Sequence, residues 1–254
     1  MDNKNLFPPC NPLTNLGRTL SENISKVKGR IAEAAQRAGR DPAEITLVAV
    51  TKTHPAEVVR AAAALGLTDF GENRIEEAAP KMLSVADPAL CWHMIGHVQS
   101  RKARDVAIAG FGIVHSVDSL KLAERLSRFA EEARRVQPVL LECNVSGDDA
   151  KAGFAAHNPA SWDKLLPEIE KILALPGIRA QGLMTMAPIV PAPGAARPYF
   201  ARLRELRDYL RARLPPGEGD WRVLSMGMTD DFEAGVAEGA TMVRIGRAIF
   251  GERA

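Results

Sequence analysis

Short apolar runs alternate along the chain with longer segments in which apolar residues recur every three or four positions. The run 45–50 is rich in β-branched and aliphatic residues and shows no polar alternation, which is typical of a strand buried on both faces. We expect strands at 45–50, 69–72, 92–95, 113–116, 138–144, 178–184, 222–225 and 242–245. The longer segments predict helices at 16–38, 56–65, 74–83, 100–107, 119–135, 161–173, 199–214 and 231–238, with a final helical turn at 248–250.

This alternation predicts an α/β fold built from repeated strand–helix units. Such units form a parallel sheet with right-handed crossovers, and eight of them can close into a (β/α)8 TIM barrel. We expect one barrel domain over 15–254 with an extra N-terminal helix, preceded by a flexible lead-in over 1–14. An open doubly wound sheet is the alternative, but it typically carries a glycine-rich fingerprint after its first strand. This chain has TKTHP there. The proline-rich stretch 188–198 is the one long loop that we expect to be flexible.

Composition narrows the class of protein. The chain has 254 residues, 46% of them hydrophobic, and a formal net charge of +2, which argues against binding nucleic acid by phosphate neutralisation. Its N-terminus lacks the apolar core of a secretory signal, and no apolar segment is long enough to span a membrane. The three widely spaced cysteines, Cys10, Cys91 and Cys143, indicate reduced thiols. We therefore expect a cytoplasmic monomer without membrane or nucleic-acid partners.

Lys52 is the most informative single residue because it follows the buried strand 45–50. A lysine in this place can have its ammonium partly desolvated, which lowers its pKa and frees the amine to attack aldehydes. A lysine that extends from a strand end into solvent is the alternative interpretation, and local context alone favours it. In a barrel, however, the carboxyl ends of the strands form the active rim. Asn73 after the second strand and Asn144 after the fifth would share that rim with Lys52.

Two glycine-containing segments follow the seventh and eighth predicted strands, where barrels often bind phosphate. The first, SMGMT, supplies a hydroxyl from Ser225 and a glycine, Gly227, that allows backbone N–H groups to approach an anion. The second, RIGR, supplies Gly246 at the start of a helical turn, with Arg244 and Arg247 beside it. Each glycine alone is better interpreted as a turn residue. Together with a reactive lysine, they point to a phosphorylated aldehyde, and pyridoxal 5′-phosphate is the obvious candidate.

Five segments of the chain carry a more specific pattern. They are AVTKTHP, FGENRIEEA, WHMIGHVQSRKARDV, GLMTM and SMGMTDDFEAGVAEGATMVRIGRAIFG. They resemble the pyridoxal phosphate homeostasis protein family, whose members are small single-domain relatives of the barrel half of alanine racemase. The resemblance implies a Schiff base between the cofactor and Lys52, and a phosphate surrounded by Ser225, Gly227 and Gly246. It also implies that Arg244 lies near the pyridine nitrogen and Asn73 near the cofactor.

One position departs from the family pattern. Many members have a small hydroxyl residue after the last glycine, where this chain has Arg247. A hydroxyl contact with the phosphate is lost there, although backbone donation is kept, and the guanidinium is free to reach either the phosphate or solvent. Elsewhere, His93 and His97 have the four-residue spacing of metal ligands on a helix, but the strand and Gly96 argue against that geometry. We therefore predict no metal site.

Whether the protein is an enzyme or a carrier depends on a second acid or base. Racemases of this fold type use the Schiff-base lysine and a tyrosine from an added β domain. This chain ends at Ala254, directly after the last barrel element, so we expect no such domain, and we place its only tyrosines, Tyr199 and Tyr209, on an outer helix. An arginine at the pyridine nitrogen would also weaken the ring as an electron sink.

We therefore predict a non-enzymatic protein that binds pyridoxal phosphate for intracellular homeostasis or delivery, with little or no turnover. The recipients implied by this role are pyridoxal phosphate-dependent apoenzymes. Two alternatives stay open. One is a pyridoxal phosphate-dependent amino-acid racemase or lyase. The other is a regulatory module that contacts proteins through the arginine-rich helix 199–214 or through the open face of the cofactor.

Overall fold

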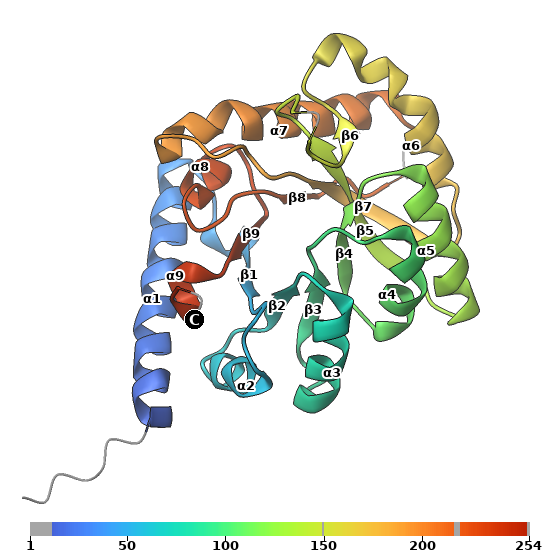
Figure 1. Ribbon diagram of the computed structural model, residues 1–254. Coiled ribbons are helices and arrows are strands. Elements are labelled where there is room, and N and C mark those ends of the chain that lie inside the picture. Colours follow the sequence, from blue (N-terminus) through green and yellow to red (C-terminus); the bar gives the residue numbers. More distant parts are fainter. Residues whose placement is uncertain (1–11, 149, 216–218, 253–254) are drawn as a thin grey trace, which may run out of the picture.

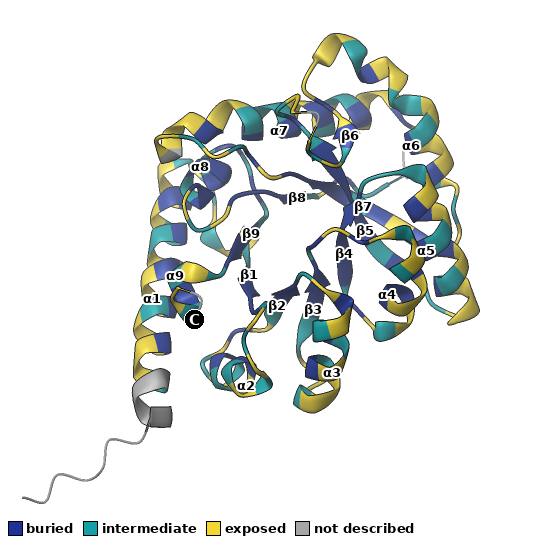
Figure 2. Cartoon of the chain, in the orientation of Figure 1, coloured by how far each residue is buried: buried dark blue, intermediate teal, exposed yellow. Residues whose placement is uncertain are grey.

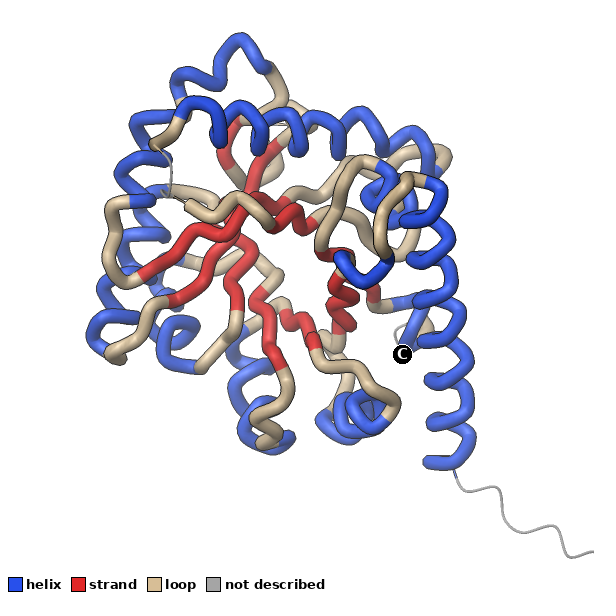
Figure 3. Tube along the Cα trace, turned by 180° about the vertical axis from the view of Figure 1, so that it is seen from behind, coloured by secondary structure: helices blue, strands red, loops and turns tan. Residues whose placement is uncertain are grey.

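The parallel strands close into a ring that is surrounded by helices (Figures 1 and 3). The computed structural model describes residues 12–148, 150–215 and 219–252. Neighbouring strands follow the order β4-β3-β2-β1-β9-β8-β7-β5-β6, and an additional pairing of β4 with β5 closes the sheet. All pairings are parallel, as repeated strand–helix units require. The predicted barrel is confirmed, and the open doubly wound alternative is wrong because β4 pairs with β5.

The strands of the ring are β1 (Thr46–Val50), β2 (Asp69–Glu72), β3 (Cys91–Met94), β4 (Ile113–Val117), β5 (Gln137–Asn144), β7 (Ile178–Met184), β8 (Val223–Ser225) and β9 (Met242–Ile245). The short strand β6 (Phe154–Ala155) pairs with the end of β5. The α-helices are α1 (Pro12–Arg37), α2 (Ala56–Ala64), α3 (Ile75–Val85), α4 (Ala103–Ala109), α5 (Leu120–Glu132), α6 (Leu166–Leu173), α7 (Arg197–Arg213), α8 (Phe232–Ala237) and α9 (Arg247–Phe250). Short 3-10 helices are η1 (Pro42–Glu44), η2 (Ser100–Lys102), η3 (Pro159–Lys164) and η4 (Pro193–Ala196).

The core has two parts, as expected for a barrel. The main apolar layer lies between the outer face of the sheet and the helices, which bury one face and expose the other (Figure 2). A smaller cluster formed by Ile113, Leu140 and Met184 belongs to the strands alone. Every residue of β4 is buried, including the polar His115 and Ser116.

Most differences from the predicted elements lie at their ends. Helix α1 begins at Pro12 instead of residue 16, so 12–14 of the expected lead-in are helical, while residues 1–11 lie outside the described ranges. The predicted helices at 100–107 and 161–173 each begin as a 3-10 turn. The proline-rich stretch 188–198, predicted as a loop, contains η4 and the first two residues of α7.

Three further expectations can be compared with the structure. Within the described ranges, no helix combines the length and the apolar character needed to cross a membrane. Cys91 and Cys143 are free thiols, as predicted, whereas Cys10 lies outside the described residues. Part of the arginine-rich face of α7 forms ion pairs within the protein, because Arg204 pairs with the buried Glu238 at 2.6 Å.

Candidate functional site

A cavity of about 210 Å³ opens at the carboxyl ends of the strands. It is lined by Val50, Lys52, Asn73, Ile95, Met186, Met228, Thr229, Asp230, Arg244, Gly246 and Arg247. Five of the seven residues predicted from the sequence therefore meet here, although they come from three separate segments. The other two, Ser225 and Gly227, are not among the residues that line this cavity.

The position of Lys52 is fixed by backbone contacts of its two neighbours in the chain, Thr51 and Thr53. The ammonium of Lys81 donates to the carbonyl oxygen of Thr51 at 2.8 Å. The backbone N–H of Thr53 donates to Oε1 of Glu77. Thr53 has a φ of 70°, a left-handed conformation that is uncommon for a β-branched residue and has to be stabilised by its surroundings. The loop that carries Lys52 is therefore fixed by α3.

The same contacts form an ionic cluster of the buried Glu72 and Lys81 with the half-buried Glu77. The Lys81 ammonium lies 2.6 Å from Oε1 of Glu72 and 2.8 Å from Oε1 of Glu77. The Thr51 hydroxyl also donates to Oε1 of Glu72, at 2.7 Å. Burial raises the pKa of Glu72, and the hydrogen bonds from Lys81 and Thr51 offset part of that effect. Sequence reasoning missed this cluster, although the four-residue spacing of Glu77 and Lys81 was a usable signal.

Asn73 is positioned by close packing against Gly96. A Cβ atom added to Gly96 would lie 2.2 Å from the carbonyl oxygen of Asn73, so no other residue fits there. The Ser116 hydroxyl donates to the Gly96 carbonyl oxygen at 2.6 Å and fixes the β3 end of this contact. Gly96 thus brings the ends of β2 and β3 together at the cavity.

Arg244 reaches the cavity from inside the barrel. Its guanidinium donates to the Ser225 hydroxyl at 2.6 Å and to the Thr185 carbonyl oxygen at 2.9 Å. Burial lowers the pKa of Arg244 to about 10, while the carboxylates of Glu142 and Asp231 act in the opposite direction. The guanidinium therefore stays charged at neutral pH. Ser225 is fully buried, and its hydroxyl is engaged inside the barrel.

The two predicted glycines have different surroundings. Gly227 has a φ of 96°, and a Cβ there would meet the Cα of Phe232 at 2.8 Å, so it is required by the turn between β8 and α8. Gly246 borders the cavity, and a Cβ there would lie 3.3 Å from the Val50 carbonyl oxygen. Thr229, at the end of the SMGMT segment, is the hydroxyl-bearing residue of this segment that lines the cavity.

The Arg247 guanidinium forms an ion pair with Asp230, and both residues line the cavity. A second carboxylate, from Glu252, lies 3.7 Å from the same guanidinium. In this structure the side chain turns to carboxylates at the cavity rim.

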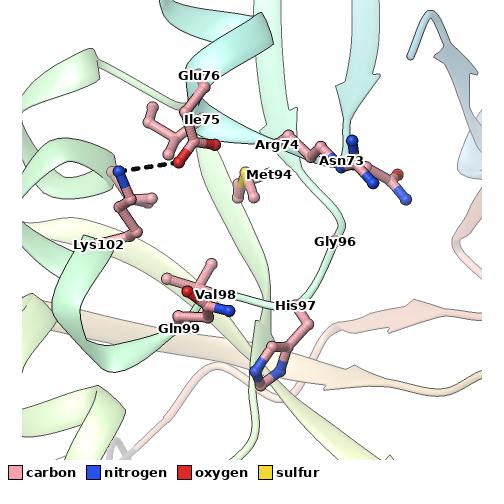
Figure 4. A pocket seen from close by; sticks show the side chains of 11 residues that line it. Asn73, Arg74, Ile75, Glu76, Met94, Gly96, His97, Val98, Gln99 and Lys102 are labelled. Carbon is pink, nitrogen blue, oxygen red and sulfur yellow. Dashed lines mark ion pairs between the residues drawn. The ribbon is translucent and has the colours of Figure 1, made fainter. Parts of the chain in front are cut away.

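Two further cavities adjoin this one and share Asn73 with it. One, of about 440 Å³, extends toward Glu142, Asn144 and Lys151. The other, of about 350 Å³, is formed largely by the segment after β3, and Lys102 pairs with Glu76 across it at 2.9 Å (Figure 4).

The two histidines of the segment WHMIGHVQSRK have separate partners. His97 pairs with Asp118 at 3.1 Å, whereas the fully buried His93 contacts His115 and Asp69. The two rings therefore do not form a pair of metal ligands.

Comparison with known proteins places these features in a family. Residues 23–254 match the family described as alanine racemase, N-terminal domain. The pyridoxal phosphate homeostasis protein of Pseudomonas aeruginosa is 48% identical over 236 residues, covering 92% of this chain and 96% of that protein. The solved structure of PipY from Synechococcus elongatus with pyridoxal phosphate bound is 35% identical, with a TM-score of 0.76 over 91% of this chain and 100% of that chain. Alanine racemase from Corynebacterium glutamicum, at 18% identity and a TM-score of 0.66, shares the fold over 93% of this chain and 61% of its own.

Proposed function

Because the chain belongs to the pyridoxal phosphate homeostasis protein family, we propose that it binds pyridoxal 5′-phosphate as a Schiff base on Lys52. We further propose that it holds the cofactor for homeostasis or delivery to pyridoxal phosphate-dependent apoenzymes, with little or no turnover. The observation that carries the proposal is the cavity itself. An amine, a buried guanidinium and a glycine at the rim converge there from β1, β9 and the turn before α9.

The lining residues match the chemistry of this cofactor. Lys52 provides the amine that an aldehyde requires. Gly246 provides close backbone approach and Thr229 a hydroxyl for a phosphate at the cavity rim, where the Arg247 guanidinium is paired with Asp230. Arg244 would face the ring, and Asn73 would contact the cofactor from the end of β2. When bound, the cofactor supplies an electrophilic carbonyl carbon and an electron-withdrawing ring.

The surroundings support a holding role over catalysis. Tyr199 and Tyr209 are the only tyrosines of the chain; both lie on α7, and neither is among the residues lining the cavity. The Arg244 guanidinium can only donate hydrogen bonds, so it would favour an unprotonated pyridine nitrogen and a weaker electron sink. These two features leave the cavity without a tyrosine as second acid or base and weaken the ring activation that a racemase needs.

The test is covalent trapping followed by peptide mapping. The protein loaded with pyridoxal phosphate is reduced with borohydride, and we expect the adduct on the peptide that contains Lys52. Lys52→Ala should lose the adduct and keep its fold, whereas Lys102→Ala, at the neighbouring cavity, should retain full labelling. An adduct on another lysine would overturn the site assignment.

Delivery has its own test. Loaded protein is mixed with a pyridoxal phosphate-dependent apoenzyme in the presence of a scavenger of free cofactor. Activation of the apoenzyme despite the scavenger supports direct transfer. Activation that disappears with the scavenger would restrict the protein to storage.

A further inference from the structure

A row of polar side chains crosses the interior of the barrel beneath the candidate cofactor cavity. Asp69 Oδ1 lies 3.0 Å from His93 Nε2, and His93 Nδ1 lies 2.9 Å from His115 Nε2. His115 Nδ1 lies 3.0 Å from the Ser225 hydroxyl oxygen, which accepts from Arg244 Nη1 at 2.6 Å. We refer to Asp69, His93, His115, Ser225 and Arg244 as the polar chain.

The polar chain joins the two ends of the barrel. Asp69 is the first residue of β2, at the amino-terminal rim, and its side chain is 22% exposed. Arg244 lines the cavity at the opposite rim. The three members between them are 0% exposed. Barrel interiors are normally filled with branched apolar side chains, so five linked polar groups need a reason beyond packing.

With both imidazoles neutral, the chemistry of the two ends fixes the direction of every hydrogen bond in between. A guanidinium can only donate, so the Ser225 oxygen accepts from Arg244. The Ser225 hydroxyl then donates a hydrogen bond to His115 Nδ1, and His115 Nε2–H donates one to His93 Nδ1. His93 Nε2–H is left to donate to Asp69, which is a carboxylate and can only accept. Four hydrogen bonds are thus satisfied by two neutral imidazoles, each protonated at Nε2.

This arrangement requires a neutral His115 and a carboxylate at Asp69. Burial lowers the pKa of His115 well below its usual value of 6.5, which keeps the ring neutral. Burial works against ionisation of Asp69, but hydrogen bonds from His93 and Thr68 outweigh it and lower the pKa of that carboxyl. The opposite direction would require a doubly protonated His93 and the Nδ1–H form of His115.

We infer that Asp69, His93 and His115 are positioning residues of the cofactor site, which act through Ser225 to orient the Arg244 guanidinium toward the bound ring. The inference rests on the proposed function, because it takes the cofactor to occupy the cavity beside Arg244. Because the Ser225 hydroxyl donates a hydrogen bond to His115 Nδ1, the lone pairs of its oxygen stay directed at Arg244. Without that acceptor the hydroxyl rotates, and Arg244 loses a fixed partner.

Asp69→Asn is the variant that tests the inference, because it changes the far end of the polar chain and leaves the cavity intact. A carboxamide can either accept from His93 or donate to it, so the direction of the chain is no longer set. We expect pyridoxal phosphate to bind about three- to tenfold more weakly, the range for the loss of one hydrogen bond, and its absorption maximum to shift. Glu44→Gln is the matched control at the same rim, where Glu44 pairs with Arg40 at an exposed position. It should change neither property.

Nitrogen NMR of the protein without cofactor separates this inference from the proposed function. Both His93 and His115 should be protonated at Nε2 alone, and the Arg244 side-chain N–H signals should be sharp. Asp69→Asn should give a mixture of histidine tautomers and broadened Arg244 signals. A His115 protonated at Nδ1, or Arg244 signals unchanged by Asp69→Asn, would overturn the inference even if the cofactor binds as proposed. If the cofactor does not bind, the proposed function fails, while these measurements still decide whether the polar chain orients Arg244.

A metal site at the amino-terminal rim of the barrel is the alternative interpretation of Asp69 and His93. Ligand atoms of Asp69, Cys91 and His93 lie within 4.8 Å of one another. A metal would take the Nε2 lone pair of His93 and displace the proton that the polar chain assigns there. With equimolar Zn²⁺, we expect the His93 Nε2–H signal to persist. Its stoichiometric loss in the wild type, prevented in Cys91→Ser, would overturn the inference in favour of a metal site.

Discussion

The ammonium of Lys81 donates a hydrogen bond to the carbonyl oxygen of Thr51, the residue immediately before the lysine proposed to carry the cofactor. Lys81 is itself nearly buried and pairs there with Glu72, which is fully buried. One side chain therefore neutralises a charge inside the protein and fixes the end of β1. Stability and the position of Lys52 should change together when this contact is removed.

Lys81→Met should lower the free energy of unfolding by about 3–5 kcal/mol, because Glu72 is left as an unpaired buried charge. Urea denaturation measures this loss. The control is Lys102→Met, which removes a more exposed pair with Glu76 and should cost at most about 1 kcal/mol. Adding Glu72→Gln to Lys81→Met should restore part of the stability. Equal small losses in Lys81→Met and Lys102→Met would show that the buried cluster does not hold the loop.

Replacing Gly246 by valine should weaken the binding of pyridoxal phosphate more than that of pyridoxal. A Cβ at this position lies 3.3 Å from the Val50 carbonyl oxygen, and the larger side chain would occupy the cavity rim where we place the phosphate. Titration of the unreduced protein with both ligands gives the comparison. Gly29→Ala, at a position with open space around it, is the control and should affect neither ligand. Equal losses for the two ligands would make Gly246 a turn residue only.

Gly227→Ala should behave differently, although sequence reasoning places both glycines at the phosphate. The backbone of Gly227 has a positive φ, and an added Cβ would collide with Phe232. We expect a loss of stability of about 1–3 kcal/mol from this strain. Affinity for the two ligands should fall in equal proportion. A selective loss of pyridoxal phosphate binding, measured by the same titration, would return Gly227 to the phosphate site.

The contrast between these glycines shows what the sequence can predict. The position of Lys52 followed from an apolar run that ends at the rim of a parallel barrel, a relationship set by connectivity. The side-chain direction of Ser225 did not follow, because the last residue of a strand can face either the lumen or the rim. Its partner His115 is 110 positions away in the chain, so only the closed barrel reveals the contact. The buried cluster around Lys81 depends likewise on the docking of α3 against the end of β1.

Stability should depend on pH through His115. Because burial holds the pKa of this imidazole well below 6.5 in the folded protein, only the unfolded chain takes up a proton as the pH falls through about 6.5. The free energy of unfolding should therefore decrease from pH 7 toward pH 5, by at most about 1.4 kcal/mol per pH unit from this group.

Urea denaturation at several pH values should show a smaller slope for His115→Asn than for the wild type. His157→Asn, at an exposed histidine, controls for the loss of an imidazole and should keep the wild-type slope. If the slope of His115→Asn equals that of the wild type, His115 does not contribute the predicted dependence.

The exchange of the α-proton of alanine or serine should proceed at close to the rate given by free pyridoxal phosphate. The cavity is lined by Lys52 but by neither tyrosine of the chain, and Arg244 would keep the cofactor ring a poor electron sink. Each missing general acid or base typically costs about a hundred- to ten-thousandfold in rate. Deuterium incorporation followed by NMR, with free cofactor at equal concentration as the reference, measures the difference.

The strongest challenge to this expectation is Glu142, whose carboxyl lines the adjoining cavity. Burial raises its pKa, with the Asp118 carboxylate adding to the effect, and a buried carboxyl with a raised pKa beside a cofactor site is a candidate general acid or base. Glu142→Gln is therefore compared with the wild type in the same exchange assay. If the protein is a carrier, the two proceed equally slowly. Racemisation on the order of 10 per second that is lost in both Glu142→Gln and Lys52→Ala would instead establish a two-base enzyme and contradict the carrier function.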